Sequence, residues 1–431
     1  MTLMRVLRRR HRGRLKLALT TLVVAVVSIA LGTLLRTDTN IDAGAQSPFL
    51  TLPPAKEAAV VTVNVSRGGR GALAWSGWGF DPSHHRTNPE ARQRPPFTSR
   101  WRRGFRGLLE FPPVVDDSGL FLQVSMSSSR RHPARSQLVS LNPESGRRRW
   151  TANLPPPVAS SPALDATSVY AISLRGQISA FRRQNGRRRW TFDIGARSES
   201  SPLLLDGTLY FGAEDGSLIA LNAMTGHVRW RRRVGGAIKG SPAFADGILV
   251  VGSYDGHVSA WSTVTGTRLW RSGSIGRSFS AGQFYSTPTI AYGRVYIGSI
   301  DHRVYSYILR TGAIAWTKST GGWVYASPAV TNQLVLIGSY DGRFRAYDAR
   351  TGAQRWSFDA GGKISGSATV VNDIVYFSAF GRGTFGLDLR SGKLRYHRKQ
   401  GRYSPVVATR DAFYFVGYNT LERLRQLHRR S

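Results

Sequence analysis

Short apolar runs alternate with glycine-containing turns between Pro113 and Tyr418, and no segment of this stretch has the period of an amphipathic helix. The run from Ile248 to Val251, for example, is rich in β-branched residues and follows the pair Asp246-Gly247. Asp-Gly pairs indicate tight hairpin turns, because both central positions of such a turn take positive φ. Further pairs begin at positions 206, 215, 255 and 341. This patterning predicts short antiparallel strands joined by hairpins.

The pattern repeats along the chain with a nearly constant period. A glycine is followed four residues later by a large aromatic residue in Gly146/Trp150, Gly186/Trp190, Gly226/Trp230, Gly266/Trp270, Gly312/Trp316, Gly352/Trp356 and Gly392/Tyr396. Consecutive aromatics lie 40 residues apart, except for a step of 46 between Trp270 and Trp316. Such a period indicates one supersecondary unit built repeatedly, whose copies stack because none can bury its apolar face alone. Four-stranded antiparallel units of this length are blades of a β-propeller.

A small residue and a proline open each unit, where a strand can begin without a donor N–H. These steps are Ser161-Pro162, Ser201-Pro202, Ser241-Pro242, Thr287-Pro288, Ser327-Pro328 and Ser404-Pro405, with Ser367-Ala368 as a variant. Five of the tryptophans precede the next such position by 12 residues, and Trp101 precedes Pro113 by the same 12. The unit that opens at Ser404 lacks its own fourth strand. We therefore predict that the strand around Trp101 completes it and closes an all-β, eight-bladed propeller of four-stranded antiparallel blades.

Two stretches are similar to the tryptophan-docking repeat of the pyrroloquinoline-quinone-like (PQQ-like) propellers: ALNAMTGHVRW at 220–230 and AYDARTGAQRW at 346–356. Residues 78–87 also resemble the lead-in that precedes such propellers, so the propeller is expected to span residues 75–431. The resemblance implies that each docking aromatic lies flat against a peptide of the neighbouring blade, which suits large rings. The residues given this structural role are Trp101, Trp150, Trp190, Trp230, Trp270, Trp316, Trp356 and Tyr396.

The residues before the propeller have a different composition. A basic segment, residues 1–16, precedes an uncharged stretch, residues 17–35, which is long enough to cross a bilayer as one helix. Positive charge on the amino side predicts a cytoplasmic tail and a single-pass signal anchor in the cell membrane, with the propeller outside. Residues 36–74 are expected to form an extracytoplasmic linker. A cleaved signal peptide is the alternative, because Ala43-Gly44-Ala45 has the small-residue pattern of a processing site.

Composition restricts the chemistry and the partners. The chain has no cysteine, which excludes disulfides, thiolate metal sites and a lipid-modified cysteine anchor. It has 60 Lys and Arg against 25 Asp and Glu, a net charge of +35, and arginine runs at 147–149, 187–189 and 231–233 flank docking aromatics. Such a field attracts polyanions. For a protein outside the membrane we expect anionic lipid headgroups or an anionic polymer rather than nucleic acid; a merely solvated arginine rim is the alternative.

Two features indicate where binding would occur. Loops are lengthened around Met126 to Ser136 and between Trp270 and Pro288, and both kinds of loop emerge on the same face of a propeller, where binding residues commonly lie. The residues just before each small-residue step are expected to line the mouth of the central channel, a concave place suited to a ligand. These binding candidates are Glu110, Glu199, Lys239, Tyr285, Tyr325 and Lys363.

The resemblance also raises the question of catalysis, because quinone-dependent alcohol and sugar dehydrogenases of the PQQ-like family hold calcium and the quinone in this channel. A PQQ- and calcium-dependent oxidoreductase is therefore the alternative function. No aligned set of oxygen ligands, no histidines at ligand spacing and no nucleophile elbow are found, so no catalytic or metal residue is assigned. Among these propellers the chain resembles the outer-membrane assembly scaffold. We expect a monomeric, non-enzymatic, membrane-anchored scaffold that binds an envelope protein or anionic polymer without a cofactor.

Overall fold

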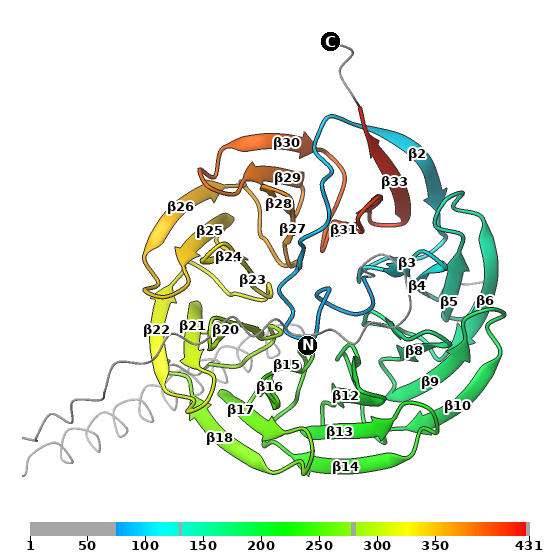
Figure 1. Ribbon diagram of the computed structural model, residues 1–431, viewed down its shortest axis with the longest axis horizontal. Helices are drawn as coiled ribbons and strands as arrows, with labels where there is room; N and C mark the ends of the chain where they lie inside the picture. Colours follow the sequence, from blue (N-terminus) through cyan, green and yellow to red (C-terminus); the bar gives the residue numbers. More distant parts are fainter. Residues whose placement is uncertain (1–74, 129–131, 277–281, 428–431) are drawn as a thin grey trace, which may run out of the picture. The chain divides into compact units, whose positions relative to one another are not determined.

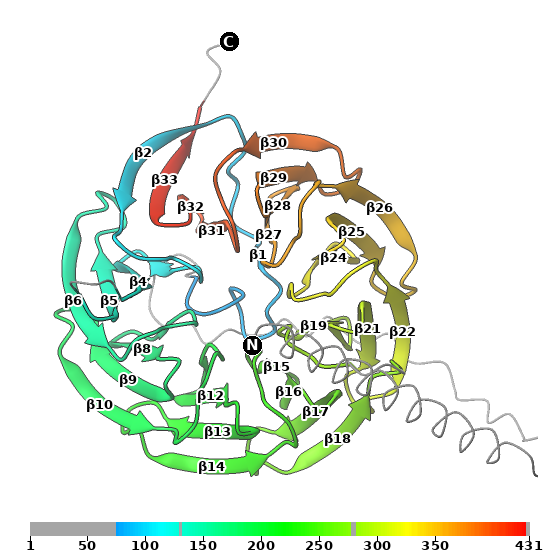
Figure 2. The same cartoon turned by 180° about the vertical axis from the view of Figure 1, so that it is seen from behind.

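The computed structural model describes residues 75–128, 132–276 and 282–427, and its regular elements there are strands arranged as a ring of eight blades (Figures 1 and 2). From the innermost strand outward, blades 1 to 4 contain β3 (Val114–Asp116), β4 (Gly119–Met126), β5 (Arg135–Leu141) and β6 (Arg148–Leu154); β7 (Ala163–Leu164), β8 (Ser168–Ile172), β9 (Gln177–Arg182) and β10 (Arg188–Asp193); β11 (Leu203–Leu205), β12 (Thr208–Gly212), β13 (Ser217–Asn222) and β14 (Val228–Arg233); β15 (Ala243–Ala245), β16 (Ile248–Gly252), β17 (His257–Ser262) and β18 (Arg268–Gly273).

Blades 5 to 8 follow in the same order. They contain β19 (Thr289–Ala291), β20 (Arg294–Ser299), β21 (Arg303–Ile308) and β22 (Ile314–Ser319); β23 (Ala329–Thr331), β24 (Leu334–Gly338), β25 (Arg343–Asp348) and β26 (Gln354–Asp359); β27 (Thr369–Val371), β28 (Ile374–Ala379), β29 (Gly383–Asp388) and β30 (Leu394–Arg398); β31 (Val406–Ala408), β32 (Phe413–Val416), β33 (Thr420–Gln426) and β2 (Phe97–Gly104). The predicted all-β, eight-bladed architecture is confirmed. Seven of the eight innermost strands begin directly after a proline, as its missing N–H favours, and the eighth, β27, begins after Ala368.

The ring closes by pairing the two ends of the propeller sequence. β2 lies antiparallel to β33, with Trp101 opposite Arg423, so blade 8 takes its outer strand from the amino-terminal end (Figure 1). This confirms the closure predicted from the 12-residue spacing. The strand that precedes β2, β1 (Thr87–Asn88), pairs in parallel with β27 at the centre of the ring.

The predicted basic tail 1–16, membrane span 17–35 and linker 36–74 lie outside the described residues. Among the residues that are described, no helix is long and apolar enough to cross a membrane.

The docking tryptophans join each blade to the next one. The indole N–H of each of the seven donates to a backbone carbonyl of the following blade, at 2.7 to 3.2 Å. The ring also covers the repeat glycine of that blade: a Cβ atom added to Gly352 would lie 2.8 Å from Cδ2 of Trp316, and six further glycines have the same relation to the preceding tryptophan. The glycine and the aromatic of one repeat therefore serve two different junctions, and only glycine leaves room for the ring.

The junction between blades 7 and 8 departs from this rule. Four residues before Trp101, where the other repeats have glycine, the closing strand has Phe97. Tyr396 therefore meets the edge of Phe97, with ring centroids 5.6 Å apart and planes at 76°, and lies 5.9 Å from Tyr376. An edge-to-face aromatic cluster replaces the stacked indole at this junction.

The Asp-Gly turns are of two kinds, which corrects part of the expectation. At Asp206-Gly207 and Asp246-Gly247 both residues have positive φ, as predicted for a tight hairpin. At 215, 255 and 341 only the glycine that follows has positive φ. There the aspartate side chain accepts a hydrogen bond from the backbone N–H two residues later, at 2.9 to 3.2 Å, and so stabilises a wider turn.

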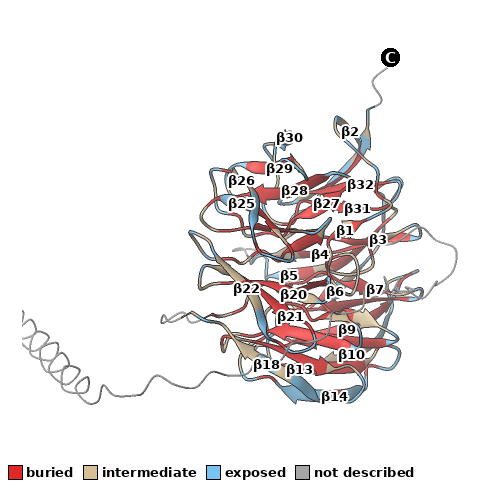
Figure 3. Ribbon diagram, turned by 60° about the vertical axis from the view of Figure 1, so that its left-hand side comes forward, coloured by how far each residue is buried: buried red, intermediate tan, exposed pale blue. Residues whose placement is uncertain are grey.

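Burial follows the radius of the ring. The second and third strands of the blades are largely buried and the outer strands largely exposed (Figure 3). The arginine runs 147–149, 187–189 and 231–233 are exposed on or beside outer strands. The apolar cores lie between neighbouring blades, so that each blade completes the core of the next.

Candidate functional site

The segment before β2 crosses the central channel and closes it. Figure 1 shows this blue segment running through the middle of the ring. It exchanges hydrogen bonds with the innermost strand of seven blades, at Val115, Leu164, Phe244, Ile290, Val330, Val370 and Ala408. Because these contacts reach nearly every blade, the segment acts as a hub that keeps the inner strands at a fixed distance from the axis.

Two basic side chains of this hub are fully buried. The guanidinium of Arg86 lies 4.6 Å from the ring centre of Trp78, and its Nε donates to the carbonyl of Ala368 at 2.6 Å. Its two terminal nitrogens have no hydrogen-bond partner within the described part of the chain, and burial lowers the pKa of Arg86 to about 9. Burial likewise lowers the pKa of His84 to about 4, so this imidazole is neutral at neutral pH.

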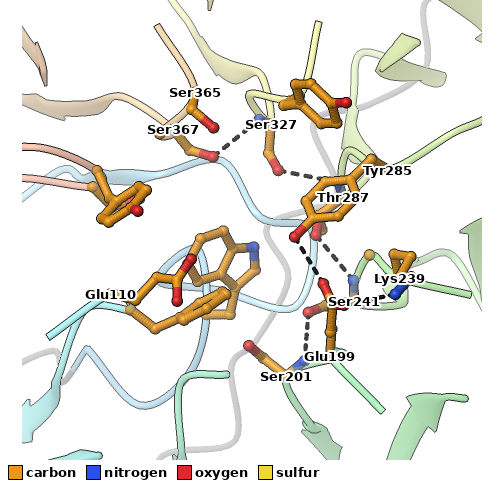
Figure 4. Close-up of a pocket in the computed structure, with 17 residues that line it drawn as sticks. Glu110, Glu199, Ser201, Lys239, Ser241, Tyr285, Thr287, Ser327, Ser365 and Ser367 are labelled. Carbon is orange, nitrogen blue, oxygen red and sulfur yellow. Dashed lines mark hydrogen bonds and ion pairs between the residues drawn. The ribbon is translucent and has the colours of Figure 1, made fainter. Parts of the chain in front are cut away.

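A belt of hydroxyl groups surrounds the channel above the hub. At five of the seven steps the small residue accepts a hydrogen bond from the backbone N–H of the equivalent residue one blade earlier, at 2.9 to 3.0 Å. The accepting oxygens belong to Ser201, Ser241, Thr287, Ser327 and Ser367 (Figure 4). The requirement for serine or threonine, rather than for any small residue, is thus a hydrogen bond between blades.

A cavity of about 80 Å³ lies inside this belt, with Trp78 and Phe111 among its lining residues. Five of the six predicted mouth residues line it: Glu110, Glu199, Lys239 and Tyr285, which Figure 4 labels, and Tyr325. Lys363 does not. At the equivalent position before blade 7, two residues before Ser367, stands Ser365, and it lines the cavity.

An ion-pair network occupies one side of the cavity. The ammonium of Lys239 lies 2.6 Å from Glu199 and 2.5 Å from Glu214, and the hydroxyl of Tyr285 donates to the second oxygen of Glu199 at 2.8 Å. Burial opposes the charge of Lys239, but its hydrogen bonds to Glu199 and Glu214 raise the pKa of the ammonium overall. These groups satisfy one another, so their charges hold the wall together.

Glu110 is the carboxyl group that stands apart from this network. Burial raises its pKa, and repulsion from Glu199 raises it further, while the nearby charge of Arg402 lowers it. A half-buried carboxyl with a raised pKa takes up a proton more readily than a free carboxyl does. Among the described residues that line the cavity, no nucleophile and base are paired around Glu110 in the pattern of a catalytic site.

An aromatic arc extends from the cavity over the loop face of blades 4 to 8. We use this name for Tyr254, Tyr285, Trp323, Tyr325, Tyr340, Phe380 and Tyr403, whose ring centroids follow one another at 4.8 to 6.4 Å. Six of them are half-buried and Trp323 is 44% exposed. The members come from inter-blade connections and from turns between second and third strands, which share one face of the propeller.

Cations border the aromatic arc. The ammonium of Lys363 lies 5.5 Å from the ring centre of Tyr340, and the guanidinium of Arg402 lies 5.2 Å from that of Phe380. Lys363 therefore belongs to the rim of the arc rather than to the cavity. Such cation–π contacts orient positive charges beside apolar rings without neutralising them.

The channel residues do not fit a calcium and quinone site. The described residues contain no group of three or more histidine, aspartate or glutamate side chains placed to hold a metal ion. Glu199 is already bound to the ammonium of Lys239, whose charge repels a second cation. The cavity of about 80 Å³ is also far smaller than the roughly 300–1,000 Å³ of pockets that enclose a ligand of drug size. We therefore derive no reaction step through a quinone.

Comparisons with known proteins agree with this architecture. The family model described as outer membrane protein assembly factor BamB matches residues 98–199, 134–252, 174–280 and 255–421, whereas no curated protein matches the sequence significantly. The fold is similar to that of BamB from Moraxella catarrhalis, with 15% identity, a TM-score of 0.63, and 77% of this chain and 100% of that chain covered.

Two other solved structures show how widely this fold is used. A quinohemoprotein alcohol dehydrogenase from Comamonas testosteroni has 13% identity and a TM-score of 0.66, with 83% of this chain and 82% of that chain covered. The computationally designed Ika8 protein has 14% identity and a TM-score of 0.62, with 74% and 97% covered. At these identities the likeness concerns the fold alone, and an enzyme, an assembly factor and a designed protein share it.

Proposed function

This chain belongs to the PQQ-like propeller family described as outer membrane protein assembly factor BamB, and on that premise we propose that it is a non-enzymatic scaffold of the cell envelope. In this proposal residues 17–35 anchor it in the cell membrane, the propeller lies outside the cytoplasm, and the aromatic arc binds a protein partner. It needs no cofactor for this function.

The aromatic arc is the observation that carries the proposal. Tyrosine and tryptophan are enriched at protein interfaces, because their large rings bury much area at a low cost in side-chain entropy. Here the rings contact one another, which restricts their motion before a partner arrives. Trp323 and Tyr418 expose 44% and 49% of their surface on this face, beside the cations Lys363 and Arg402. An apolar patch bordered by charge is typical of an interaction site.

The closed channel supports binding over the face rather than passage or catalysis inside. The hub ties the inner strands together, and the Lys239 network satisfies the charges of one wall. A rigid frame with a shallow, aromatic-rimmed mouth suits a partner segment that lies across the loops. Neither the hub nor the hydroxyl belt needs to move for such a partner to bind.

The test is crosslinking of the full chain in its own membranes, followed by purification and identification of the attached proteins. We expect the double variant Trp323→Ala, Tyr340→Ala to reduce the yield of the partner by more than about tenfold, as for the loss of interface hot spots. The matched control is Tyr292→Ala, because Tyr292 is 51% exposed in the β19–β20 turn on the opposite face.

Equal yields from the arc variant and from Tyr292→Ala would refute binding on the arc. A yield that depends on the arginine run 187–189 and falls steeply with salt would instead indicate an anionic polymer as the partner.

A second experiment tests on which side of the membrane the propeller lies. Because the chain has no cysteine, Met224→Cys introduces a single thiol, at a side chain that is 75% exposed. An impermeant maleimide should label it in intact cells, and labelling only after lysis would contradict the extracytoplasmic location.

A further inference from the structure

A second hollow lies between blades 8 and 1 and shares no lining residue with the mouth cavity. We call it the blade 8–1 groove. Its volume is about 530 Å³, within the range of about 300–1,000 Å³ that small-ligand pockets occupy. Its lining comes from the end of β2 and the segment after it, and from β4, β5 and the start of β6.

The floor of the groove is apolar apart from Gln137, which stands opposite Val124. Val139 and Leu141 alternate along β5, and Val124 and Met126 alternate along β4, so all four side chains stand on the face of blade 1 that meets blade 8. Val124, Val139 and Leu141 are buried and Met126 is half-buried. Phe105 adds an aromatic wall from the blade 8 side. A ligand that reached this floor would gain hydrophobic contact.

The walls are held in place by the protein itself. The segment after β2 is attached to blade 8, where the N–H of Phe105 donates to the carbonyl of Asn419 at 2.8 Å. It is also attached to blade 1, where Leu108 and Ser125 exchange two backbone hydrogen bonds of 2.8 and 3.2 Å. A Cβ atom on Gly107 would lie only 2.5 Å from the carbonyl oxygen of Ser125, so glycine permits this close crossing. The groove is therefore formed without a ligand.

The rim of the groove is positively charged. Arg103, Arg106 and Arg148 line it and are exposed, and no acidic residue is among its described lining residues. The Nε of Arg103 donates to the carbonyl of Gly146 at 2.7 Å. The side chains of Arg106 and Arg148 form no hydrogen bond or ion pair with any other described residue. Within the described residues, two guanidinium groups without an ion-pair partner thus stand beside this floor.

We propose that the blade 8–1 groove binds a fatty acid with an acyl chain like that of dodecanoic acid, with this chain on the floor and the carboxylate between Arg106 and Arg148. An inorganic anion or an anionic polymer would use the arginines but leave the floor empty, and an uncharged apolar molecule would leave the arginines unpaired. Guanidinium groups bind carboxylates through paired N–H donors. This site is independent of the aromatic arc and of the proposed scaffold function.

The test measures binding of dodecanoic acid to the full chain in nanodiscs of zwitterionic lipid, by displacement of a fluorescent fatty acid. We expect Arg106→Glu and Arg148→Glu each to weaken binding by about tenfold or more, because each replaces attraction by repulsion. The matched control is Arg188→Glu, which changes the same repeat position one blade later, where the guanidinium lies 5.8 Å from the ring centre of Phe181 instead. It should leave the affinity unchanged.

A third variant tests the floor. Gly104 lines the groove and a Cβ atom added there meets no atom within 4 Å, so Gly104→Phe adds a ring at the groove from an unobstructed Cβ position. We expect it to abolish binding while the melting temperature stays that of the parent chain. If Gly104→Phe does not fold, the exposed Arg106→Glu variant still decides the question.

Several results would overturn the proposal. Equal weakening by Arg188→Glu would mean that surface charge in general attracts the ligand. Equal binding of dodecanol would remove the role of the arginines, and equal binding of hexanoic acid would remove that of the floor. Capture of phosphatidylglycerol vesicles without binding of dodecanoic acid would assign the rim to a diacyl lipid surface and contradict a fatty-acid site.

Discussion

The stacking of Trp316 on Gly352 allows a quantitative test of how blades are joined. The backbone of Gly352 has φ of 70°, and an added Cβ would lie 2.8 Å from Cδ2 of the indole. Gly352→Ala should therefore lower the free energy of unfolding through two effects. The left-handed backbone costs an alanine about 1–2 kcal/mol, and displacement of the packed ring costs about 1–3 kcal/mol.

Removal of the ring separates the two effects. Trp316 is 8% exposed and its indole N–H donates to the carbonyl of Ala349 at 2.9 Å, so Trp316→Ala alone should lower the free energy of unfolding by about 3–5 kcal/mol. In that background Gly352→Ala meets no ring; it retains its backbone cost and a contact of 2.7 Å with Cε of Lys318, the flexible end of a side chain that can move away. The double-mutant cycle should give a coupling of about 1–3 kcal/mol.

The assay is equilibrium unfolding in urea, followed by circular dichroism for the parent chain, the two single variants and the double variant. Trp323→Ala is the matched control, because the same residue type is 44% exposed there and should change the free energy of unfolding by less than about 0.5 kcal/mol. Additive effects of the two substitutions would refute the claim that Gly352 is required by the ring of Trp316. A small effect of Trp316→Ala would refute the docking role itself.

Two further perturbations test the hub and the ring closure. Burial lowers the pKa of His84 to about 4, so as pH falls below about 6.5 the imidazole is protonated in the unfolded chain before it is protonated in the folded chain. The free energy of unfolding should therefore decrease by roughly 3 kcal/mol between pH of about 6.5 and about 4. Urea midpoints of the parent chain and of His84→Gln should diverge in this pH window, and parallel pH profiles would contradict the reasoning. Glu422, 7% exposed, binds Arg398 at 2.5 Å across the junction of blades 7 and 8. Glu422→Leu should lower the free energy of unfolding by about 3–5 kcal/mol, because it leaves Arg398 without its partner. The control Asp373→Asn removes the exposed ion pair with Arg94 and should lower the free energy of unfolding by less than about 1 kcal/mol. Similar decreases in the two variants would contradict a special role of Glu422 at the closure.

The number of blades and the way the ring closes were predictable because they depend on counting along the chain. The constant 12-residue interval assigned Trp101 to an outer strand that the carboxyl-terminal unit lacked, and β2 pairs with β33 as expected. For each docking ring the sequence predicted the type of contact, a peptide of the neighbouring blade, but not which residue supplies it. The glycine that receives the ring stands in the following repeat, so its role becomes visible only when the blades are placed side by side.

The site was predictable where it follows the repeat register. Glu110, Glu199, Lys239, Tyr285 and Tyr325 line the mouth cavity because residues at one repeat position stand at one radius of the ring. Lys363 stands two residues outside that register and lies over Tyr340 instead. The missed lining groups, Ser365 and the hydroxyl belt, carried a signal in the sequence, since every step has serine or threonine where any small residue would fit the strand.

The aromatic arc was missed for a different reason. Tyr254, Tyr340 and Phe380 occupy turns of separate blades, and nothing in their local sequence distinguishes them from other turn residues. They meet because neighbouring turns emerge on one face and tilt toward the channel. The blade 8–1 groove is lined by residues between 103 and 148, and it forms because β2 pairs with β33 in blade 8 while β4 to β6 belong to blade 1.

The sequence alone determined the strand pattern, the blade count and the closing strand, because hydrophobic period, turn residues and repeat interval are local or additive properties of the chain. The tertiary structure decided which side chains meet: the hub through the channel, the ion pairs of Lys239, the arc and the groove. These depend on the distance and orientation between blades, which are set by packing of whole sheets against one another rather than by any single repeat.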